Sequence, residues 1–259
     1  LVGNIGHPIL SVKKVSKKTI FIIEASSYQL EYSKIFKSKY VAILNLAPDH
    51  IERHLTIKRY VKAKFKLLKN QSKKNFAFLK KNDILIQNEL RANKFKSKIT
   101  KVDIRSINNF LKKMDNNYFL TDANKENLSF VLEISKKFDL KKNLLLKTLK
   151  KFKGLKYRQQ IIFNKKNLTI INDSKSTSFA SSTGVLKAND NIYWLLGGIH
   201  KKEDKFNLPK KYFKNIKAFI YGKNKKFFEK KLKYKIKYEN FNNIREAVNK
   251  VFINLKKEK

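Results

Sequence analysis

Cysteine is absent from the 259-residue chain, and glycine and proline are scarce, with 7 and 3 residues respectively. The lack of cysteine excludes disulfide-stabilised folds, thiolate zinc sites and cysteine nucleophiles. No uninterrupted apolar run approaches the roughly 18 residues of a membrane helix, and no signal peptide with a charged start and an apolar middle is present. We therefore expect a soluble, cytoplasmic protein without membrane insertion.

Acidic residues are few: 20 Asp and Glu stand against 61 Lys and Arg, which gives a formal net charge of +41. Only six of the basic residues are arginine, the side chain that makes bidentate contacts to bases and phosphates. Lysine is spread through every segment, as the codons of an A- and T-rich genome would produce. We expect no specific nucleic-acid partner, although a basic nucleic-acid-binding module stays open as the non-enzymatic alternative.

Hydrophobic residues make up 42% of the chain, with 20 Phe and 11 Tyr, so the protein is expected to fold around a core. Short apolar runs alternate with amphipathic lysine-rich stretches, which is typical of α/β folds. Gly154 interrupts this rhythm, and we place a domain boundary there, giving domains 1–153 and 154–259.

The same patterns predict the individual elements. The first domain is expected to hold strands at 19–23, 40–46, 76–79, 84–87 and 99–104, and helices at 57–70, 124–138 and 141–152. A second βα series follows, with strands at 159–163, 168–171, 192–196 and 218–221, and helices at 178–187 and 243–255. Ligands of doubly wound sheets gather beyond the carboxyl ends of strands, so the polar residues there are candidates for chemistry.

Three candidates lie in the first domain. Glu24 follows one predicted strand and His50 follows the next, and a carboxylate and an imidazole so placed can ligate a divalent cation such as Mg²⁺. Alternatively, Glu24 caps a helix and His50 is an ordinary loop residue. Lys64 lies among apolar residues on its predicted helix, where its amine either extends to solvent or is chemically occupied.

Two candidates lie in the second domain. The polar run at 172–177, Asn-Asp-Ser-Lys-Ser-Thr, ends a strand and opens a helix whose free N–H groups, with Lys175, can bind an anion. The alternative is a simple N-cap at Asp173 or Ser174. Gly197 and Gly198 either let the backbone approach a ligand or form a tight turn.

The order and spacing of these segments resemble the Mur ligase family. The matching strings are GNIGHP at 3–8, EASSYQLE at 24–31, NLAPDHIERH at 45–54, Tyr60 with Ala63-Lys64, NDSKST at 172–177 and GGIHK at 197–201. The NDSKST run resembles most closely the branch of the family that adds D-glutamate to UDP-N-acetylmuramoyl-L-alanine. The resemblance implies a partial central ATPase domain followed by a partial, Rossmann-like doubly wound domain.

The resemblance also implies an ATP-dependent amide ligase of cell-wall synthesis that works through an acyl phosphate. It assigns Mg²⁺ to Glu24, His50 and a carbamylated Lys64, with His50 and Lys64 also catalytic. The positions that match ATP contacts are Asn124, Asn127, Arg158, Asp173 and Lys175. The positions that match substrate contacts are Asn4, Ser26, Lys175, Thr177 and Lys201.

The chain also departs from the family pattern. The segment 121–127 keeps both asparagines but lacks the family's Gly and His, and 157–160 keeps only Arg158 of His-Arg-x-Glu. No G-x-x-G-K-[ST] phosphate loop is present. We therefore expect an internal fragment, inactive alone, without the N-terminal domain, the phosphate loop and the C-terminal end. Another Mur or folylpolyglutamate-type ligase specificity remains the enzymatic alternative.

Overall fold

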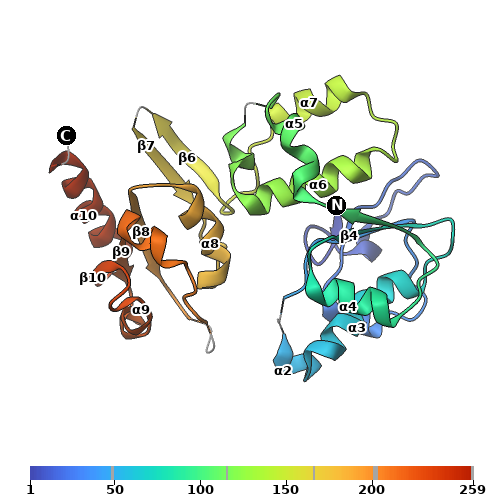
Figure 1. The fold of residues 1–259 in the computed structure, drawn as a ribbon, viewed down its shortest axis with the longest axis horizontal. Helices are drawn as coiled ribbons and strands as arrows, with labels where there is room; N and C mark the ends of the chain where they lie inside the picture. Colours follow the sequence, from blue (N-terminus) through green and yellow to red (C-terminus); the bar gives the residue numbers. More distant parts are fainter. Residues whose placement is uncertain (48–49, 115, 166, 201–203, 258–259) are drawn as a thin grey trace. The chain divides into compact units, whose positions relative to one another are not determined.

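The computed structural model describes residues 1–47, 50–114, 116–165, 167–200 and 204–257. The chain forms two compact units, one of residues 1–109 and 126–140 and the other of residues 110–125 and 141–259 (Figure 1). Within the described ranges, every helix is too short or too polar to cross a membrane.

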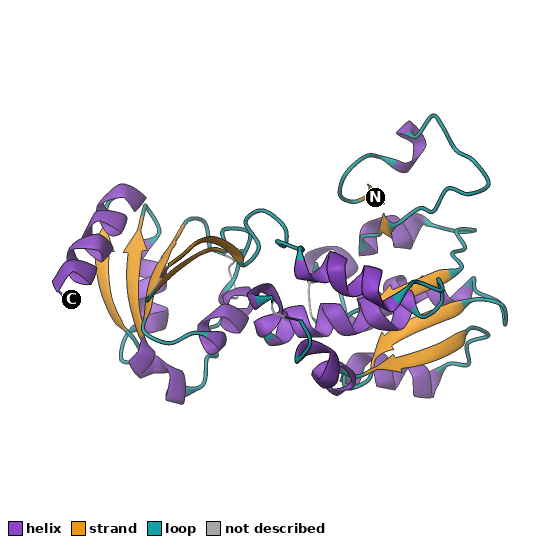
Figure 2. Ribbon diagram, turned by 90° about the horizontal axis from the view of Figure 1, so that it is seen from above, coloured by secondary structure: helices purple, strands orange, loops and turns teal. Residues whose placement is uncertain are grey.

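A three-stranded parallel sheet organises the first unit. Its strands, in sheet order, are β3 (Tyr40–Ile43), β4 (Phe76–Lys80) and β5 (Lys98–Val102). The helices that cover the sheet are α3 (Ile57–Lys69), α4 (Ile84–Ala92) and α6 (Asp122–Ser135) (Figure 2). Ala77 and Leu79 of β4 share a core with Phe65 of α3, whereas Phe78 packs with Phe130 of α6. The central strand is therefore buried on both faces, as parallel sheets require.

The rest of the first unit carries the candidate residues. The elements are β1 (Val2–Gly3), η1 (Ile9–Ser11), β2 (Ile23–Glu24), α1 (Ser27–Tyr32), α2 (Ile51–His54) and η2 (Ile104–Ile107), while α5 (Asn108–Leu111) spans the division between the units. β1 and β2 pair in parallel.

Two strand predictions for this unit are wrong. Residues 84–87 begin helix α4, because the Asp83 carboxylate accepts a hydrogen bond from the Ile86 N–H at 3.1 Å and caps the helix. Of the predicted buried strand at 19–23, only Ile23 is in a strand, and Ile20 and Ile22 are 68% and 65% exposed.

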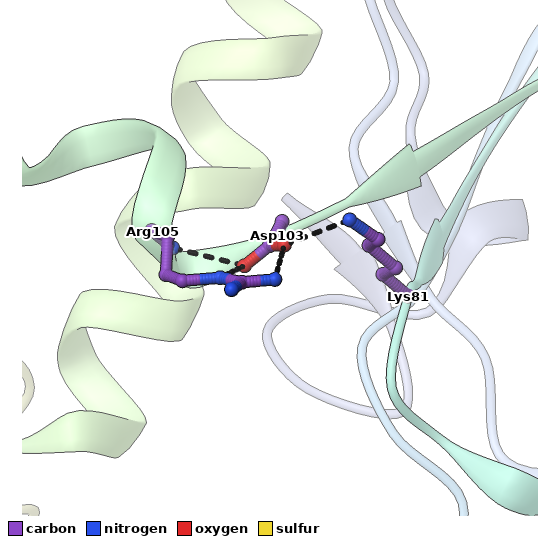
Figure 3. A network of polar contacts seen from close by, with 3 residues as sticks. All are labelled: Lys81, Asp103 and Arg105. Carbon is purple, nitrogen blue, oxygen red and sulfur yellow. Dashed lines mark hydrogen bonds and ion pairs between the residues drawn. The ribbon is translucent and has the colours of Figure 1, made fainter.

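A network of charged side chains lies directly after the end of β5 (Figure 3). Asp103 accepts hydrogen bonds from the Arg105 side chain at 3.0 and 3.3 Å, from the Arg105 N–H at 3.0 Å and from the Lys81 ammonium at 3.1 Å. These bonds, above all those from Arg105, hold the pKa of the Asp103 carboxyl well below its usual range.

The second unit contains another three-stranded parallel sheet. Its strands, in sheet order, are β10 (Lys237–Phe241), β9 (Ile216–Tyr221) and β8 (Ile192–Gly197). α8 (Phe179–Ala188) and α9 (Lys225–Leu232) contribute to one core with Ala218 and Ile220. Phe219 points to the opposite face and is fully buried, and α10 (Ile244–Lys257) packs against all three strands.

An antiparallel pair precedes this sheet. The pair consists of β6 (Gln160–Lys165) and β7 (Leu168–Asn172), so these two strands exist as predicted but do not open a parallel βα series. The remaining elements are η3 (Asn117–Leu120), α7 (Lys142–Lys150) and η4 (Lys210–Asn215). The predictions omitted β1, α1, α2, α5, α9, β10 and the 3₁₀ segments η1 to η4.

Candidate functional site

The pairing of β1 with β2 brings Asn4 to Glu24. The Asn4 side chain donates to Glu24 Oε1 at 3.2 Å, and the Asn4 N–H donates to the Glu24 carbonyl at 2.8 Å. Gly3 makes this approach possible: its φ is +107°, and a Cβ there would lie 2.3 Å from the Glu24 carbonyl oxygen. Both Asn4 and Glu24 are exposed, so each can contact a ligand.

Ser26, not Glu24, caps the helix that comes next. Ser26 Oγ accepts from the Gln29 N–H at 3.2 Å, and Gln29 Oε1 accepts from the Ser26 N–H at 2.9 Å. This reciprocal capping box starts α1 and leaves the Glu24 carboxylate outside the helix. The Ser26 hydroxyl therefore has a structural role beside any contact with substrate.

His50 is held in an unusual backbone conformation just before α2. Its φ is +54° and its ψ is 35°, which is the left-handed region that non-glycine residues seldom occupy. Its ring centroid lies 4.9 Å from that of Tyr28, and its Nδ1 lies 3.6 Å from Glu52 Oε1. Such strain persists only where the surrounding structure fixes it, and it is frequent at functional positions.

A layer of aromatic rings connects the surroundings of His50 to those of Lys64. Tyr28 also packs on His54, at 5.8 Å between centroids, and His54 packs on Tyr60 at 5.6 Å. The half-buried Lys64 places its Nζ 6.0 Å from the Tyr60 ring centroid. The structure thus gathers His50 and Lys64 around rings from α1, α2 and α3.

His54 is a site residue that sequence reasoning left without a role. It is 2% exposed, and its Nε2 lies 2.9 Å from Ser27 Oγ. This hydrogen bond ties α1, which begins three residues after Glu24, to α2, which begins directly after His50. Two signals for it were available in the sequence: its i, i+4 spacing from His50 and its place at the end of the NLAPDHIERH string.

A preformed metal site is not complete in the described part of the chain. No group of three or more His, Asp or Glu side chains there is close enough to hold a metal ion. Asp49, adjacent to His50, lies outside the described residues. Glu24 and His50 are suitable donor types, but the described side chains do not by themselves fit the implied Mg²⁺ site.

In the second unit, the start of α6 meets Gln159. Asn124 is 5% exposed, and its side-chain N–H groups donate to the Tyr118 carbonyl at 2.6 Å and to Gln159 Oε1 at 2.9 Å. The Thr121 hydroxyl donates to the same Gln159 oxygen at 2.8 Å. Asn127, one turn further along the helix, is exposed.

Gln159 also connects this cluster to the end of β7. Its backbone N–H donates to Asp173 Oδ1 at 2.9 Å, and the Ser176 hydroxyl donates to Asp173 Oδ2 at 2.5 Å. Burial raises the pKa of the Tyr118 hydroxyl, and the charge of Arg158 opposes that rise. The structure therefore brings together Asn124, Arg158 and Asp173, three of the residues expected at ATP.

Three backbone amides of the polar run at 172–177 are hydrogen-bonded within the protein. The N–H of Ser174 donates to Asn172 Oδ1 at 3.1 Å, that of Lys175 to the Tyr157 carbonyl at 3.0 Å, and that of Ser176 to the Asp173 carbonyl at 2.8 Å. These three N–H groups are therefore not available to an anion. The side chains of Lys175 and Thr177 are exposed.

The next helix, α8, begins within one residue of the predicted start at 178. Ser178 caps it through a reciprocal box with Ser181, so neither Asp173 nor Ser174 is the N-cap. The Phe179 N–H donates to Asp204 Oδ2 at 2.9 Å, so a carboxylate of the same chain occupies this helix start.

Gly197, the last residue of β8, and Gly198, which follows it, differ in their surroundings. A Cβ on Gly197 would lie 2.4 Å from the Tyr221 carbonyl oxygen, so glycine is required there by the neighbouring strand β9. Gly198 has φ +99° and open space around it. Lys201, the predicted D-glutamate contact, lies outside the described residues.

A comparison with models of protein families decides which family the chain belongs to. Residues 4–145 match the model of the Mur ligase middle domain. The chain belongs to the Mur ligase family. This match includes Asn4, Glu24, His50, Lys64 and Asn124 and ends before Arg158.

Curated relatives extend the similarity into the second unit. A UDP-N-acetylmuramoylalanine--D-glutamate ligase of Rickettsia felis is 32% identical over 263 residues, covering 95% of this chain and 58% of the relative. The corresponding ligase of Rickettsia prowazekii is 31% identical, covering 95% of this chain and 59% of the relative. The chain thus spans less than two thirds of the length of these Mur ligases.

Solved structures confirm the fold class. The Mur ligase MurF of Thermotoga maritima, in complex with ADP, has a TM-score of 0.60 and 12% identity, covering 88% of this chain and 59% of that one. The predicted α/β fold of partial Mur ligase domains is therefore confirmed.

Proposed function

We propose that this chain is part of an ATP-dependent ligase that joins D-glutamate to UDP-N-acetylmuramoyl-L-alanine in peptidoglycan synthesis. The observation that carries the proposal is that D-glutamate ligases match 95% of the chain, including the NDSKST run beyond the family's middle domain. We also propose functional domains at 1–153 and 154–259, and a cytoplasmic location, where ATP and the UDP-linked precursor would be available.

The proposed reaction has two steps. The terminal carboxylate of UDP-N-acetylmuramoyl-L-alanine takes the γ-phosphoryl group of ATP, and ADP leaves. The amine of D-glutamate then attacks the acyl carbon, a tetrahedral intermediate forms, and phosphate leaves as the amine loses a proton. Both steps concentrate negative charge, so cationic groups must neutralise it.

The described residues support this chemistry in particular ways. Arg158 is an exposed cation beside the Asn124 and Asp173 cluster and is suited to a nucleotide phosphate. Lys175 presents an exposed ammonium, which suits a carboxylate of D-glutamate, and the exposed hydroxyl of Thr177 can add a hydrogen bond. We propose Asn4 and Ser26 as contacts to the UDP-linked substrate, Asn127 as a further ATP contact, and Lys201 as a second cation for D-glutamate.

A resident Mg²⁺ and a carbamylated Lys64 remain proposals that rest on the family. A carbamate would turn the Lys64 amine into an anionic oxygen donor, the type of ligand that Mg²⁺ prefers, and would add a ligand where the described side chains do not form a group of three.

Phosphate release by the complete protein that contains this chain tests the proposal. With ATP and UDP-N-acetylmuramoyl-L-alanine supplied, D-glutamate should stimulate phosphate release, whereas L-glutamate and diamino acids such as L-lysine should not. Stimulation by a diamino acid would indicate another Mur specificity, and stimulation by L-glutamate with a folate acceptor would indicate a folylpolyglutamate-type ligase. Either result would overturn the D-glutamate assignment.

A further inference from the structure

We infer that Gln159 is a positioning residue of the nucleotide site, which it builds by joining the start of α6 to the end of β7. The inference rests on the proposed ATP-dependent function. Gln159 itself occupies the unspecified position of the family's His-Arg-x-Glu pattern, so the resemblance gives it no role.

Three hydrogen bonds centre on this residue. Its Oε1 accepts from the Thr121 hydroxyl at 2.8 Å and from the Asn124 amide at 2.9 Å, and its N–H donates to Asp173 Oδ1 at 2.9 Å. The partners are 38, 35 and 14 residues away along the chain. The side chain and the backbone N–H of Gln159 therefore hold the start of α6 near the end of β7, and both segments carry candidate ATP contacts.

The backbone around Arg158 needs such support. Tyr157 has φ +65° and Gln159 has φ +47°, so two non-glycine residues in left-handed conformations flank the arginine. Each such residue is unfavourable by itself and persists only where other contacts determine it. Hydrogen bonds fix both conformations here. The Tyr157 N–H donates to Gln160 Oε1 at 3.0 Å, and the Tyr157 carbonyl accepts from the Lys175 N–H at 3.0 Å. Gln159 is held by the bonds described above.

Asn124 acts inside this framework. Its side-chain N–H groups already donate to Tyr118 and Gln159, and it is 5% exposed, so it has no N–H to offer a nucleotide. Arg158, which lies between Tyr157 and Gln159, has an exposed side chain. Gln159 therefore acts on the nucleotide through the placement of Arg158 and Asp173.

Binding of ATP to the complete protein, measured by calorimetry without the other substrates, tests the inference. Gln159→Leu keeps the bulk but removes the acceptor, and we expect the Kd for ATP to rise about tenfold through misplacement of Arg158. Gln159→Glu restores an acceptor oxygen and should stay within about threefold of the wild type. Thr121→Val removes one donor only and should raise the Kd by a smaller factor, which keeps the test available if Gln159→Leu does not fold.

Gln71→Ala is the matched control. Gln71 lies in the first unit, where its side-chain amide donates to the carbonyls of Ser38 at 3.0 Å and Phe76 at 3.2 Å. The Gln71→Ala variant should lower the urea midpoint of unfolding, as we also expect of Gln159→Leu, but it should leave the Kd for ATP unchanged. An unchanged Kd in both Gln159→Leu and Thr121→Val would overturn the inference while leaving the proposed function intact. A wild-type protein that does not bind ATP would overturn both.

Discussion

Replacing Ser27 with alanine should destabilise the first unit, because it leaves a buried imidazole without its partner. Ser27 and His54 are each 2% exposed, and Ser27 Oγ lies 2.9 Å from His54 Nε2. His54 Nδ1 has no hydrogen-bond partner in the described part of the chain. The variant would therefore bury an unsatisfied ring, at a cost of about 1–3 kcal/mol in the free energy of unfolding.

Ser129→Ala is the matched control for this prediction. Ser129 is fully buried, but its hydroxyl donates to the Glu126 carbonyl at 2.6 Å within the same helix. Removing that hydroxyl leaves no ring unsatisfied, and alanine has the higher helix propensity. We expect a change of less than about 1 kcal/mol.

Urea unfolding followed by two probes locates the effect. Far-UV circular dichroism reports on both units, whereas the fluorescence of Trp194, the single tryptophan, reports on β8 of the second unit. Ser27→Ala should lower the midpoint seen by circular dichroism more than that seen by fluorescence. Equal midpoints for Ser27→Ala and Ser129→Ala would refute the reasoning.

Three further predictions concern charged residues. Because Arg105 and Lys81 lower the pKa of Asp103, its contribution to stability is complete above about pH 5 and declines as the pH falls below about 4, where the unfolded chain takes up the proton first. Asp103→Asn should thus lower the urea midpoint at pH 7, with a difference from the wild type that narrows by pH 3; a constant difference would contradict this. Lys64→Ala should abolish turnover in the complete enzyme and regain part of it with added short carboxylates, whereas full turnover of Lys64→Gln without additive would exclude carbamylation. Lys175→Ala should raise the KM for D-glutamate about ten- to hundredfold in steady-state assays, and an unchanged KM would remove Lys175 from that site.

The elements that could be predicted from the sequence have a long, regular apolar pattern. Helix α3 is confirmed because Tyr60, Val61, Phe65 and Leu68 repeat at helical spacing and are all buried. The run at 84–87 is too short to distinguish a strand from a helix, and the capping bond from Ile86 to Asp83 decides it.

The site is predictable in its positions but not in its contacts. Asp173 directly follows a strand as expected, and Glu24 is the last residue of the short strand β2. The bonds that hold the site connect residues far apart, such as Ser27 with His54 and Asn124 with Gln159. No local pattern encodes such pairs, since they depend on how helices and strands pack.

The two asparagines retained in the segment 121–127 differ in the structure although they look alike in the sequence. Their spacing of three places them on one side of α6, where both would be expected to contact a ligand. Asn124, however, is buried and donates both of its side-chain hydrogen bonds within the protein, whereas Asn127 is exposed. Asn124 therefore depends on an acceptor that the motif does not contain, and the residue that supplies it, Gln159, determines whether the neighbouring Arg158 is held in place.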